Sequence, residues 1–551
     1  MTAATVSPRA PFLCRAPFLW TLVAIGAALR IYQYASDTSF WFDELSLVRN
    51  IVHMTEAQLM TEPLRYDQVA PVGFLVAEKA ISRVLGESDL AFRALLLPAG
   101  LAALVAFLFL SQRLLDGYAV PFAVALFAIG APFIRYSAEV KQYGIDILGL
   151  VVMLLVTLRL RDPDSTTARA IRAGLLGCAL VWVSQATMLT LAGLGGALLL
   201  AWMRERDRPT ARALRIAVPI WAAACIAAAL VTFRLVTPAT RAFMDQFWRL
   251  RGGFAPWPIE KPKDLLWLWD RVLALFGDNR VLAYPSPWAA AYTALVIVGF
   301  VVLGRRRGAG ALVLLGPLAV AVLAAVFGFY PFHSRVALFT LPVLVLASAA
   351  AAEEIRRTLA RRHAALGAAA MLALFAGPAV AFVRRPLPYF VEDHESVLAF
   401  LRDHRRPGDA IFVFPYEVEA VERYGAGFGL TPADYDVGGC SSDDRRVFLR
   451  DVDRYRGRAR VWLIAGAVPP VQPPRSDVEA YLSAIGTRKD GLAVPSAFPI
   501  APVSVTLFDL SDPERLASAN AETFPIQTKP APGDPRPNVV VRCADWFKPL
   551  K

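Results

Sequence analysis

The segment "GLLGCALVWVSQATMLTLAGLGGALLLAWM" (residues 174–203) decides the fold of this chain. It carries no charged residue, and as one helix it would extend about 45 Å, which is too long for one ordinary membrane span and short for two. Its flanks, residues 159–172 and 204–215, are both rich in arginine. Because such flanks collect on the cytoplasmic side, we predict a short hairpin that turns near Ser184 and Gln185.

The composition excludes an ordinary soluble globular protein, since 56% of the 551 residues are hydrophobic and only 19% are charged. Apolar runs of about 17 to 25 residues are typical of helices that cross a bilayer. Counting the hairpin as two, we expect about eleven spans. The runs lie near residues 16–33, 91–110, 118–133, 144–160, 174–203, 216–236, 288–302, 310–329, 336–352 and 364–383.

Charge distribution predicts the orientation of these spans. The net charge of +12 comes largely from arginine clusters in the short loops assigned to the inner face, so we expect anionic lipid headgroups rather than nucleic acid as their partner. No small-residue cleavage site follows the first span, which is therefore predicted to be a retained anchor. With a cytoplasmic N-terminus and an odd count, a multi-pass protein of the inner cell membrane would expose residues 34–90, 134–143, 237–286 and everything beyond 384 outside.

The tail differs in composition from the rest. Residues 385–551 regain polar side chains around three short apolar stretches, "AIFVFPY" (410–416), "RVWLIAG" (460–466) and "VSVTLFDL" (503–510), which predict buried strands. The predicted fold is therefore mainly α, with a membrane domain over residues 1–384 and a C-terminal extracytoplasmic α/β domain over 385–551. In that compartment Cys440 and Cys543 are either a disulfide or two free thiols.

An acidic pair opens the first segment assigned to the outer face. In "SFWFDELSLVRN" (residues 39–50), Asp43 and Glu44 follow the first span closely. Carboxylates kept near a membrane commonly line a polar cavity or a reaction site. The alternative is that both acids cap or solvate a surface helix, with Glu44 in its first turn.

The second outer segment is short and dense in polar side chains. "FIRYSAEVKQYGID" (residues 133–146) is too short to fold alone, and lysine is rare in the chain before the tail. An ammonium group suits a phosphate as a point charge, although an interfacial lysine beside an aromatic anchor is the alternative. The candidate donor-binding residues of this segment are Arg135, Tyr136, Glu139, Lys141 and Tyr143.

Two further segments on the same face carry cationic and aromatic groups. "FGFYPFHSRVALF" (residues 327–339) supplies Tyr330, His333 and Arg335, which we add to the candidate donor-binding residues. Residues 241–272 are long, aromatic and basic, and they either anchor the chain at the membrane interface or gate a lipid donor. Cationic loops and an acidic pair on one face are what transfer from a phosphate-linked donor requires.

The order of three motifs resembles a known superfamily. "WFDE" (residues 41–44), "APVGFLVAEKAISRVLGESDLAFRALLLPAG" (70–100) and "RYSAEVKQYG" (135–144) are similar to the membrane glycosyltransferases of the GT-C superfamily. The similarity is to the branch that includes protein-mannosyltransferase-like and aminoarabinose-transferase-like enzymes, of the glycosyltransferase family 39 type. It covers residues 32–150, and the remaining spans match by hydropathy and topology.

This resemblance implies transfer of a sugar from a polyprenyl-phosphate donor to a lipid, glycan or protein hydroxyl on the outer face, without a nucleotide cofactor. Asp43 would be the catalytic base, and Glu44 would position the acceptor or a metal. Glu139, Lys141 and Tyr143 would lie in the donor-facing loop. A single base without a covalent carboxylate intermediate predicts inversion at the anomeric carbon.

Departures from the family pattern concern the metal and the third loop. Relatives often have a histidine before the proline of the second motif, whereas "DQVAP" (residues 67–71) has none. A divalent ion is therefore an open expectation, with Asp43, Asp67 and Glu139 as its candidate ligands. "FHSRV" (332–336) also differs from the Arg-Tyr pair of relatives, which weakens the assignment of Arg335.

Three other functions stay open at this point. A transporter or flippase of lipid-linked glycans also needs many spans, although it commonly has internal repeats, which we do not find. A polymerase or ligase of lipid-linked glycans is closer in chemistry. A non-catalytic membrane scaffold for the tail would leave the acidic pair unexplained.

Overall fold

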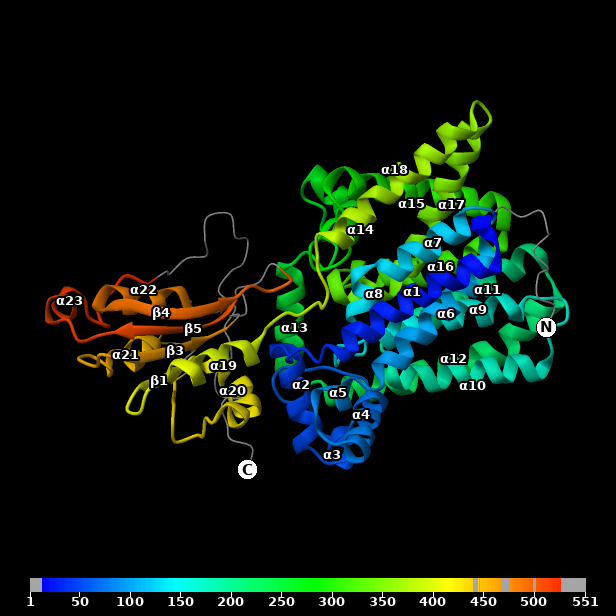
Figure 1. The fold of residues 1–551 in the computed structure, drawn as a ribbon. Coiled ribbons are helices and arrows are strands. Elements are labelled where there is room, and N and C mark those ends of the chain that lie inside the picture. The colour runs from blue at the N-terminus through cyan, green and yellow to red at the C-terminus, as the bar shows by residue number, and fades with distance from the viewer. Residues whose placement is uncertain (1–11, 440–443, 445, 467–474, 499–501, 527–551) are drawn as a thin grey trace. The chain divides into compact units, whose positions relative to one another are not determined.

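The structure, a computed structural model, describes residues 12–439, 444, 446–466, 475–498 and 502–526 (Figure 1). The chain divides into two compact units. The membrane unit contains the described residues of Met1–Asp37, Thr55–Pro63 and Val69–Tyr389, and the sheet unit contains those of Thr38–Met54, Leu64–Gln68 and Phe390–Lys551. Cys440 and Cys543 lie outside the described residues, so the disulfide stays a prediction.

Helices make up the membrane unit. They are η1 (Phe12–Cys14), α1 (Ala16–Ala35), α3 (Glu56–Thr61), α4 (Val72–Leu85), α5 (Asp89–Arg93), α6 (Leu96–Leu114), α7 (Ala119–Ile129), α8 (Ala131–Arg135), α9 (Tyr143–Leu160), α10 (Thr167–Val183), α11 (Ala186–Glu205), α12 (Arg208–Leu235), α13 (Pro238–Leu250), η2 (Pro262–Leu266), α14 (Trp267–Gly277), α15 (Ser286–Arg307), α16 (Ala309–Val326), η3 (Ser334–Thr340), α17 (Leu341–Ala360) and α18 (Ala364–Val383).

Within the described ranges, 9 helical segments are long and apolar enough to cross a membrane. This confirms a multi-pass, mainly α architecture. The segments are Ala16–Ala35, Asp89–Leu114, Tyr143–Leu160, Ala186–Glu205, Arg208–Leu235, Ser286–Arg307, Ala309–Val326, Ser334–Ala360 and Ala364–Val383. The two other predicted spans correspond to α7 and α10, which are shorter helices of 11 and 17 residues. The count of eleven therefore stays a prediction.

The long apolar run breaks into two helices where the sequence predicts a turn. Helix α10 ends at Val183 and α11 begins at Ala186. The hydroxyl of Ser184 donates to Asp146 Oδ1 at 2.5 Å, and Ser184 Oγ accepts from the backbone N–H of Thr187 at 3.1 Å. These polar contacts satisfy groups that the interruption leaves without helical partners. Helix α10 then packs chiefly beside α12 (Figure 1).

Close helix packing explains why small residues recur in these spans. Helix α17 is buried along most of its length, as expected of a helix that is apolar on all sides. Helices α11 and α16 touch backbone to backbone: a Cβ on Gly193 would lie 2.3 Å from the carbonyl carbon of Gly316. Only glycine permits that approach.

We predict that Gly193→Leu lowers the thermal stability of the purified protein and its yield in membranes, because α11 and α16 must separate to admit the side chain. Gly196→Leu is the matched control, since a Cβ there meets nothing within 4 Å. The measurement is the apparent unfolding temperature in detergent. Equal effects of the two substitutions would contradict the packing described.

The sheet unit holds the strands and the remaining helices. They are α2 (Phe42–His53), α19 (His394–His404), β1 (Ala410–Val413), η4 (Pro415–Glu417), α20 (Val418–Tyr424), η5 (Gly425–Phe428), β2 (Asp436–Val437), α21 (Val447–Asp453), β3 (Val461–Ala465), α22 (Arg475–Ile485), β4 (Thr487–Val494), β5 (Val503–Asp509) and α23 (Pro513–Ser518). The predicted C-terminal α/β region is confirmed, and its three predicted strands are β1, β3 and β5.

Its mixed sheet has the order β2-β1-β3-β5-β4, with β1 parallel to β2 and β3, and β5 antiparallel to β3 and β4. Ala410 pairs with Val461, and Val461 with Phe508. Alternate strand residues enter two cores, one shared with α21 and α22 and the other with α19. The sheet is therefore covered on both faces, which explains its continuous apolar strands.

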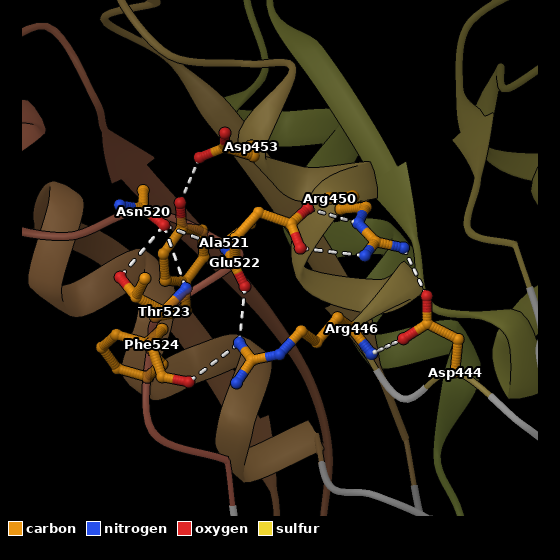
Figure 2. Close-up of polar contacts among 10 residues, drawn as sticks. Asp444, Arg446, Arg450, Asp453, Asn520, Ala521, Glu522, Thr523 and Phe524 are labelled. Atoms are coloured by element: carbon orange, nitrogen blue, oxygen red, sulfur yellow. Dashed lines mark hydrogen bonds and ion pairs between the residues drawn. The ribbon is translucent and has the colours of Figure 1, made fainter.

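Side chains of α21 and its N-terminal flank bind residues 520–524, the segment that follows α23 (Figure 2). Arg450 pairs with Glu522 through two contacts of 2.5 and 2.9 Å, and Arg446 donates to the carbonyl oxygens of Ala521 and Phe524 at 2.8 and 3.1 Å. Asn520 Oδ1 accepts hydrogen bonds from the backbone N–H groups of Glu522 and Thr523. These contacts attach residues 520–524 to α21 and its N-terminal flank, and none of them involves α2.

Candidate functional site

The acidic pair lies in the first turn of α2. Glu44 is buried, with 3% exposure, and its Oε2 accepts from the backbone N–H of Trp41 at 3.4 Å. A carboxylate there satisfies an N–H that the helix leaves unpaired and suits the positive end of the helix dipole. Glu44 thus makes the capping contact that the sequence left as an alternative.

The Asp43 carboxylate is oriented by a neighbouring turn of the sheet unit. Its Oδ1 accepts from Gln68 Nε2 at 3.2 Å. That turn is fixed to α2 by Asn50, whose Oδ1 accepts from Arg65 N at 2.8 Å. Tyr66 has the left-handed φ value of 62°, a conformation that is uncommon for bulky residues. The turn is therefore held in place largely by its contacts with α2.

Carboxylates from the C-terminal part of the chain hold the start and the middle of α2. The backbone N–H of Phe42 donates to Glu392 Oε2 at 2.7 Å, although the two residues are 350 positions apart. Further along the helix, Ser46 Oγ contacts Glu419 at 3.3 Å, and Arg49 pairs with the same carboxylate at 3.3 Å. Burial raises the pKa of Glu419 to about 7, against the opposing effects of Arg49 and Ser46.

Glu392 belongs to a buried row of charges. His394 lies between two carboxylates, with Nε2 at 3.3 Å from Glu392 and Nδ1 at 3.1 Å from Glu417, and all three side chains are 3% exposed or less. Burial alone would lower the pKa of His394, but Glu417 and Glu392 outweigh it and raise that pKa to about 10. The imidazole is therefore cationic at neutral pH. Burial raises the pKa of Glu392, and the neighbouring His394 opposes that shift.

In the membrane unit, the second predicted cluster is a buried loop between α8 and α9. Arg135 pairs with Glu139, and its guanidinium lies 5.0 Å from the ring centre of Tyr136. Tyr136 in turn packs edge-on against Tyr143 at 5.2 Å. Lys141 is 5% exposed. Charged groups kept at such burial in a membrane protein mark a functional site more often than a surface anchor.

The third predicted cluster lies near the second. Burial raises the pKa of Tyr330 well above its ordinary value, and the charges of Asp146 and Tyr143 add to the effect, so the start of α9 and the loop before η3 are neighbours. The Tyr330 hydroxyl donates to the Val336 carbonyl at 3.1 Å. His333 packs 5.9 Å from Trp248, between ring centres.

Four arginines act on the charge state of His333, and the sequence singled out only Arg335 among them. Burial, followed by the charges of several arginines, lowers the pKa of His333 to about 3, which leaves its imidazole neutral at physiological pH. Burial lowers the pKa of Arg385, and the charge of Arg135 adds a smaller effect in the same direction. The arginines acting on His333 are Arg271, Arg251, Arg280 and Arg335. The sequence did contain a signal for these arginines, because the positive-inside rule does not account for arginines in segments assigned to the outer face.

The membrane unit thus brings together Arg135, Tyr136, Glu139, Lys141 and Tyr143 with the neighbouring Tyr330, His333 and Arg335, whereas Asp43, Glu44 and Asp67 belong to the sheet unit. No group of three or more histidines, cysteines, aspartates and glutamates arranged to hold a metal ion occurs among the described residues. One oxygen of Glu139 is also committed to Arg135. The divalent ion therefore stays a prediction.

Comparisons with known proteins give likeness of fold. No family model matches the chain, and no curated protein matches it. The apo Archaeoglobus fulgidus oligosaccharyltransferase is similar, with 13% identity and TM-score 0.47, over 74% of this chain and 64% of that one, which is less than two-thirds of its length. ArnT from Cupriavidus metallidurans bound to undecaprenyl phosphate has 12% identity and TM-score 0.45, over 89% of this chain and 98% of that one.

A third similar structure is AglB from Archaeoglobus fulgidus with an inhibitory peptide and a dolichol-phosphate, at 13% identity and TM-score 0.47, over 86% of this chain and 72% of that one. These proteins are membrane glycosyltransferases of the GT-C superfamily, which the sequence also resembles. Similarity at this level carries no argument about activity.

We predict that His394→Gln lowers the free energy of unfolding by about 3–5 kcal/mol, because it leaves two buried carboxylates without their cation. The raised pKa of His394 means that its stabilisation is complete below the ordinary value near 6.5 and is lost as pH rises through about 10. The difference from wild type should therefore be largest near pH 6.5 and shrink toward pH 10.

Thermal unfolding in detergent, followed across that pH range, measures this difference. The control is His404→Gln, which alters an exposed histidine of the same helix. A His394→Gln penalty that is independent of pH, or equal to that of the control, would contradict the assigned imidazolium.

Proposed function

We propose that this protein transfers a sugar from a polyprenyl-phosphate donor to a hydroxyl of a lipid, glycan or protein acceptor. The observation that carries the proposal is the gathering of cationic side chains from separate segments of the membrane unit. Arg251, Arg271, Arg280 and Arg335 act together on His333, and the charge of Arg135 acts on Arg385. Arg135 and Lys141 are buried, Arg251, Arg271 and Arg335 are half-buried, and Arg280 is exposed. Cations gathered in this way suit an anionic ligand, and the lipid phosphate of the donor is one.

The cationic residues have a clear role in the proposed reaction. When the bond between the anomeric carbon and the phosphate oxygen breaks, the electron pair leaves with the phosphate. Lys141, with Arg135 and Arg335, offsets the charge that builds on the leaving group. Tyr143 donates a hydrogen bond, and neutral His333 can do the same without adding a charge, whereas the hydroxyl proton of Tyr330 is already donated to the Val336 carbonyl.

Asp43 supplies the other half of the chemistry. Its carboxylate accepts the proton of the acceptor hydroxyl while the oxygen forms the new bond to the anomeric carbon. The carboxylic acid later returns that proton to water. Because the attacking oxygen is the acceptor's own and no carboxylate bonds to the sugar, the configuration at the anomeric carbon inverts. Glu44 serves this role indirectly, by capping the helix that carries Asp43.

The proposed location follows from the arginine-rich short loops. They support a cytoplasmic N-terminus and a sheet unit on the opposite, extracytoplasmic side of the inner cell membrane. A donor already activated as a lipid phosphate suits that compartment, because the reaction then needs no nucleotide. The identities of the sugar and acceptor depend on the shape of the bound complex.

The proposal predicts that Asp43→Asn lowers the rate of transfer about 10²- to 10⁴-fold, since the amide retains the size of the carboxylate but cannot accept the proton. The measurement uses protein reconstituted in vesicles with a labelled polyprenyl-phosphate sugar and a membrane extract as the source of acceptors. Glu62→Gln is the control, because it neutralises an exposed acid of the same segment.

Two outcomes would reject the proposal. Undiminished turnover by Asp43→Asn would remove Asp43 as the base. Movement of intact donor across the vesicle bilayer without any sugar transfer would favour a transporter of lipid-linked glycans instead.

A further inference from the structure

The chain passes between the two units five times, and the residues next to the first and last crossings are hydrogen-bonded to each other. At the end of the membrane unit, Gln33 Nε2 donates to the carbonyl of Tyr389 at 2.9 Å, and the Tyr389 N–H donates to Gln33 Oε1 at 2.7 Å. In the sheet unit, the Phe42 N–H reaches Glu392 within a few residues of the same crossings. The segment that carries Asp43 therefore begins next to the first residues of the C-terminal region, near Glu392.

Inside the sheet unit, that segment is fixed through its backbone. The Phe40 N–H donates to the hydroxyl of Tyr424 at 2.7 Å, and the Phe42 N–H donates to Glu392 at 2.7 Å. The Phe42 ring packs edge-on against Tyr416 at 5.9 Å. Hydrogen bonds from backbone N–H groups set the direction of the chain, and they do so at the residue immediately before Asp43.

The acceptor of the Phe42 N–H is itself held rigidly. Glu392 is paired with His394, His394 also contacts Glu417, and the three side chains are buried. Gly466 at the end of β3 allows this arrangement, because a Cβ there would lie 1.5 Å from Glu417 Oε1. The row from Glu417 through His394 to Glu392 thus connects the end of β3, the central strand of the sheet, to the first turn of α2.

We propose that Glu392 is a positioning residue, which holds the first turn of α2 through the Phe42 N–H and so fixes the direction of the Asp43 carboxylate. This inference rests on the proposed function, in which Asp43 is the base. It assigns the C-terminal domain a role in the reaction itself, beyond selecting an acceptor or covering a site. Glu392 touches neither donor nor acceptor.

Position matters strongly for a general base, because a displacement of about 1 Å can cost on the order of 10²-fold in rate. Loss of Glu392 leaves Phe42 N–H without its acceptor and His394 with one carboxylate in place of two. The first turn of α2 then depends on Glu44 and on the contacts of Gln68 and Tyr424. We expect it to be less well ordered, with Glu419 still holding the later turns.

The test compares wild type, Glu392→Ala and Glu392→Gln in the full-length protein, with two readouts. The first is hydrogen–deuterium exchange of peptides that cover residues 38–54. The second is steady-state transfer of a labelled polyprenyl-phosphate sugar. We expect Glu392→Ala to speed exchange in residues 38–46 and to lower kcat about 10-fold or more, with the KM for the donor changed by less than about threefold.

Glu392→Gln should recover most of the loss in kcat, because its amide oxygen can still accept from the Phe42 N–H. A merely structural role would not give this rescue together with a selective effect on kcat. The matched control is Glu522→Gln, which breaks the bidentate pair with Arg450 in the same unit (Figure 2). It should leave both exchange in residues 38–54 and kcat unchanged.

Unchanged exchange in Glu392→Ala would overturn the inference. So would faster exchange with full activity in a protein whose Asp43→Asn variant is inactive, and in that case the proposed function would survive. Full activity of Asp43→Asn would instead remove the proposed base, and the positioning role would fall with it. The exchange data separate these cases because they do not depend on turnover.

Discussion

The hydrogen bond between the Phe42 N–H and the buried carboxylate of Glu392 is the constraint on which the account depends. It makes a segment that directly follows the first membrane span part of a folded unit built from the other end of the chain. A buried carboxylate is costly unless it is paired, and here it is paired with both a backbone donor and the His394 imidazolium. The acidic segment is therefore part of the sheet unit and is held there by buried polar contacts. Breaking those contacts would cost free energy.

The candidate residues are divided between the two units. The membrane unit contributes cations, which come from the loop before α9, from α13 and α14, and from the segment before α17. The sheet unit contributes the carboxylate of Asp43 on α2. In the proposed reaction the cations bind the phosphate of the donor, and Asp43 accepts the proton of the acceptor hydroxyl.

The sequence was sufficient for the features that depend on local pattern. Hydropathy located the spans, and arginine flanks with Ser184 and Gln185 located the break between α10 and α11. Apolar runs found β1, β3 and β5, whereas β2 is too short and β4 too polar to give such a signal. The packing of α2 could not be predicted, because its partners are about 350 positions away and are ordinary acids of a polar region. Arg251, Arg271 and Arg280 were missed because they are spread over a long aromatic segment, and only folding brings them around His333.

In the proposed reaction the membrane unit binds the lipid phosphate, whereas Asp43 acts only in the chemical step. Equilibrium binding of a polyprenyl phosphate without sugar tests it most directly, in wild type, Lys141→Met and Asp43→Asn, with the exposed Lys263→Met as control. The account predicts binding at least about 10-fold weaker in Lys141→Met, since a charge-assisted contact to phosphate is worth roughly 1.5–3 kcal/mol, and undiminished binding in the other two variants. Equal binding by Lys141→Met and wild type, or weakened binding by Asp43→Asn, would contradict it.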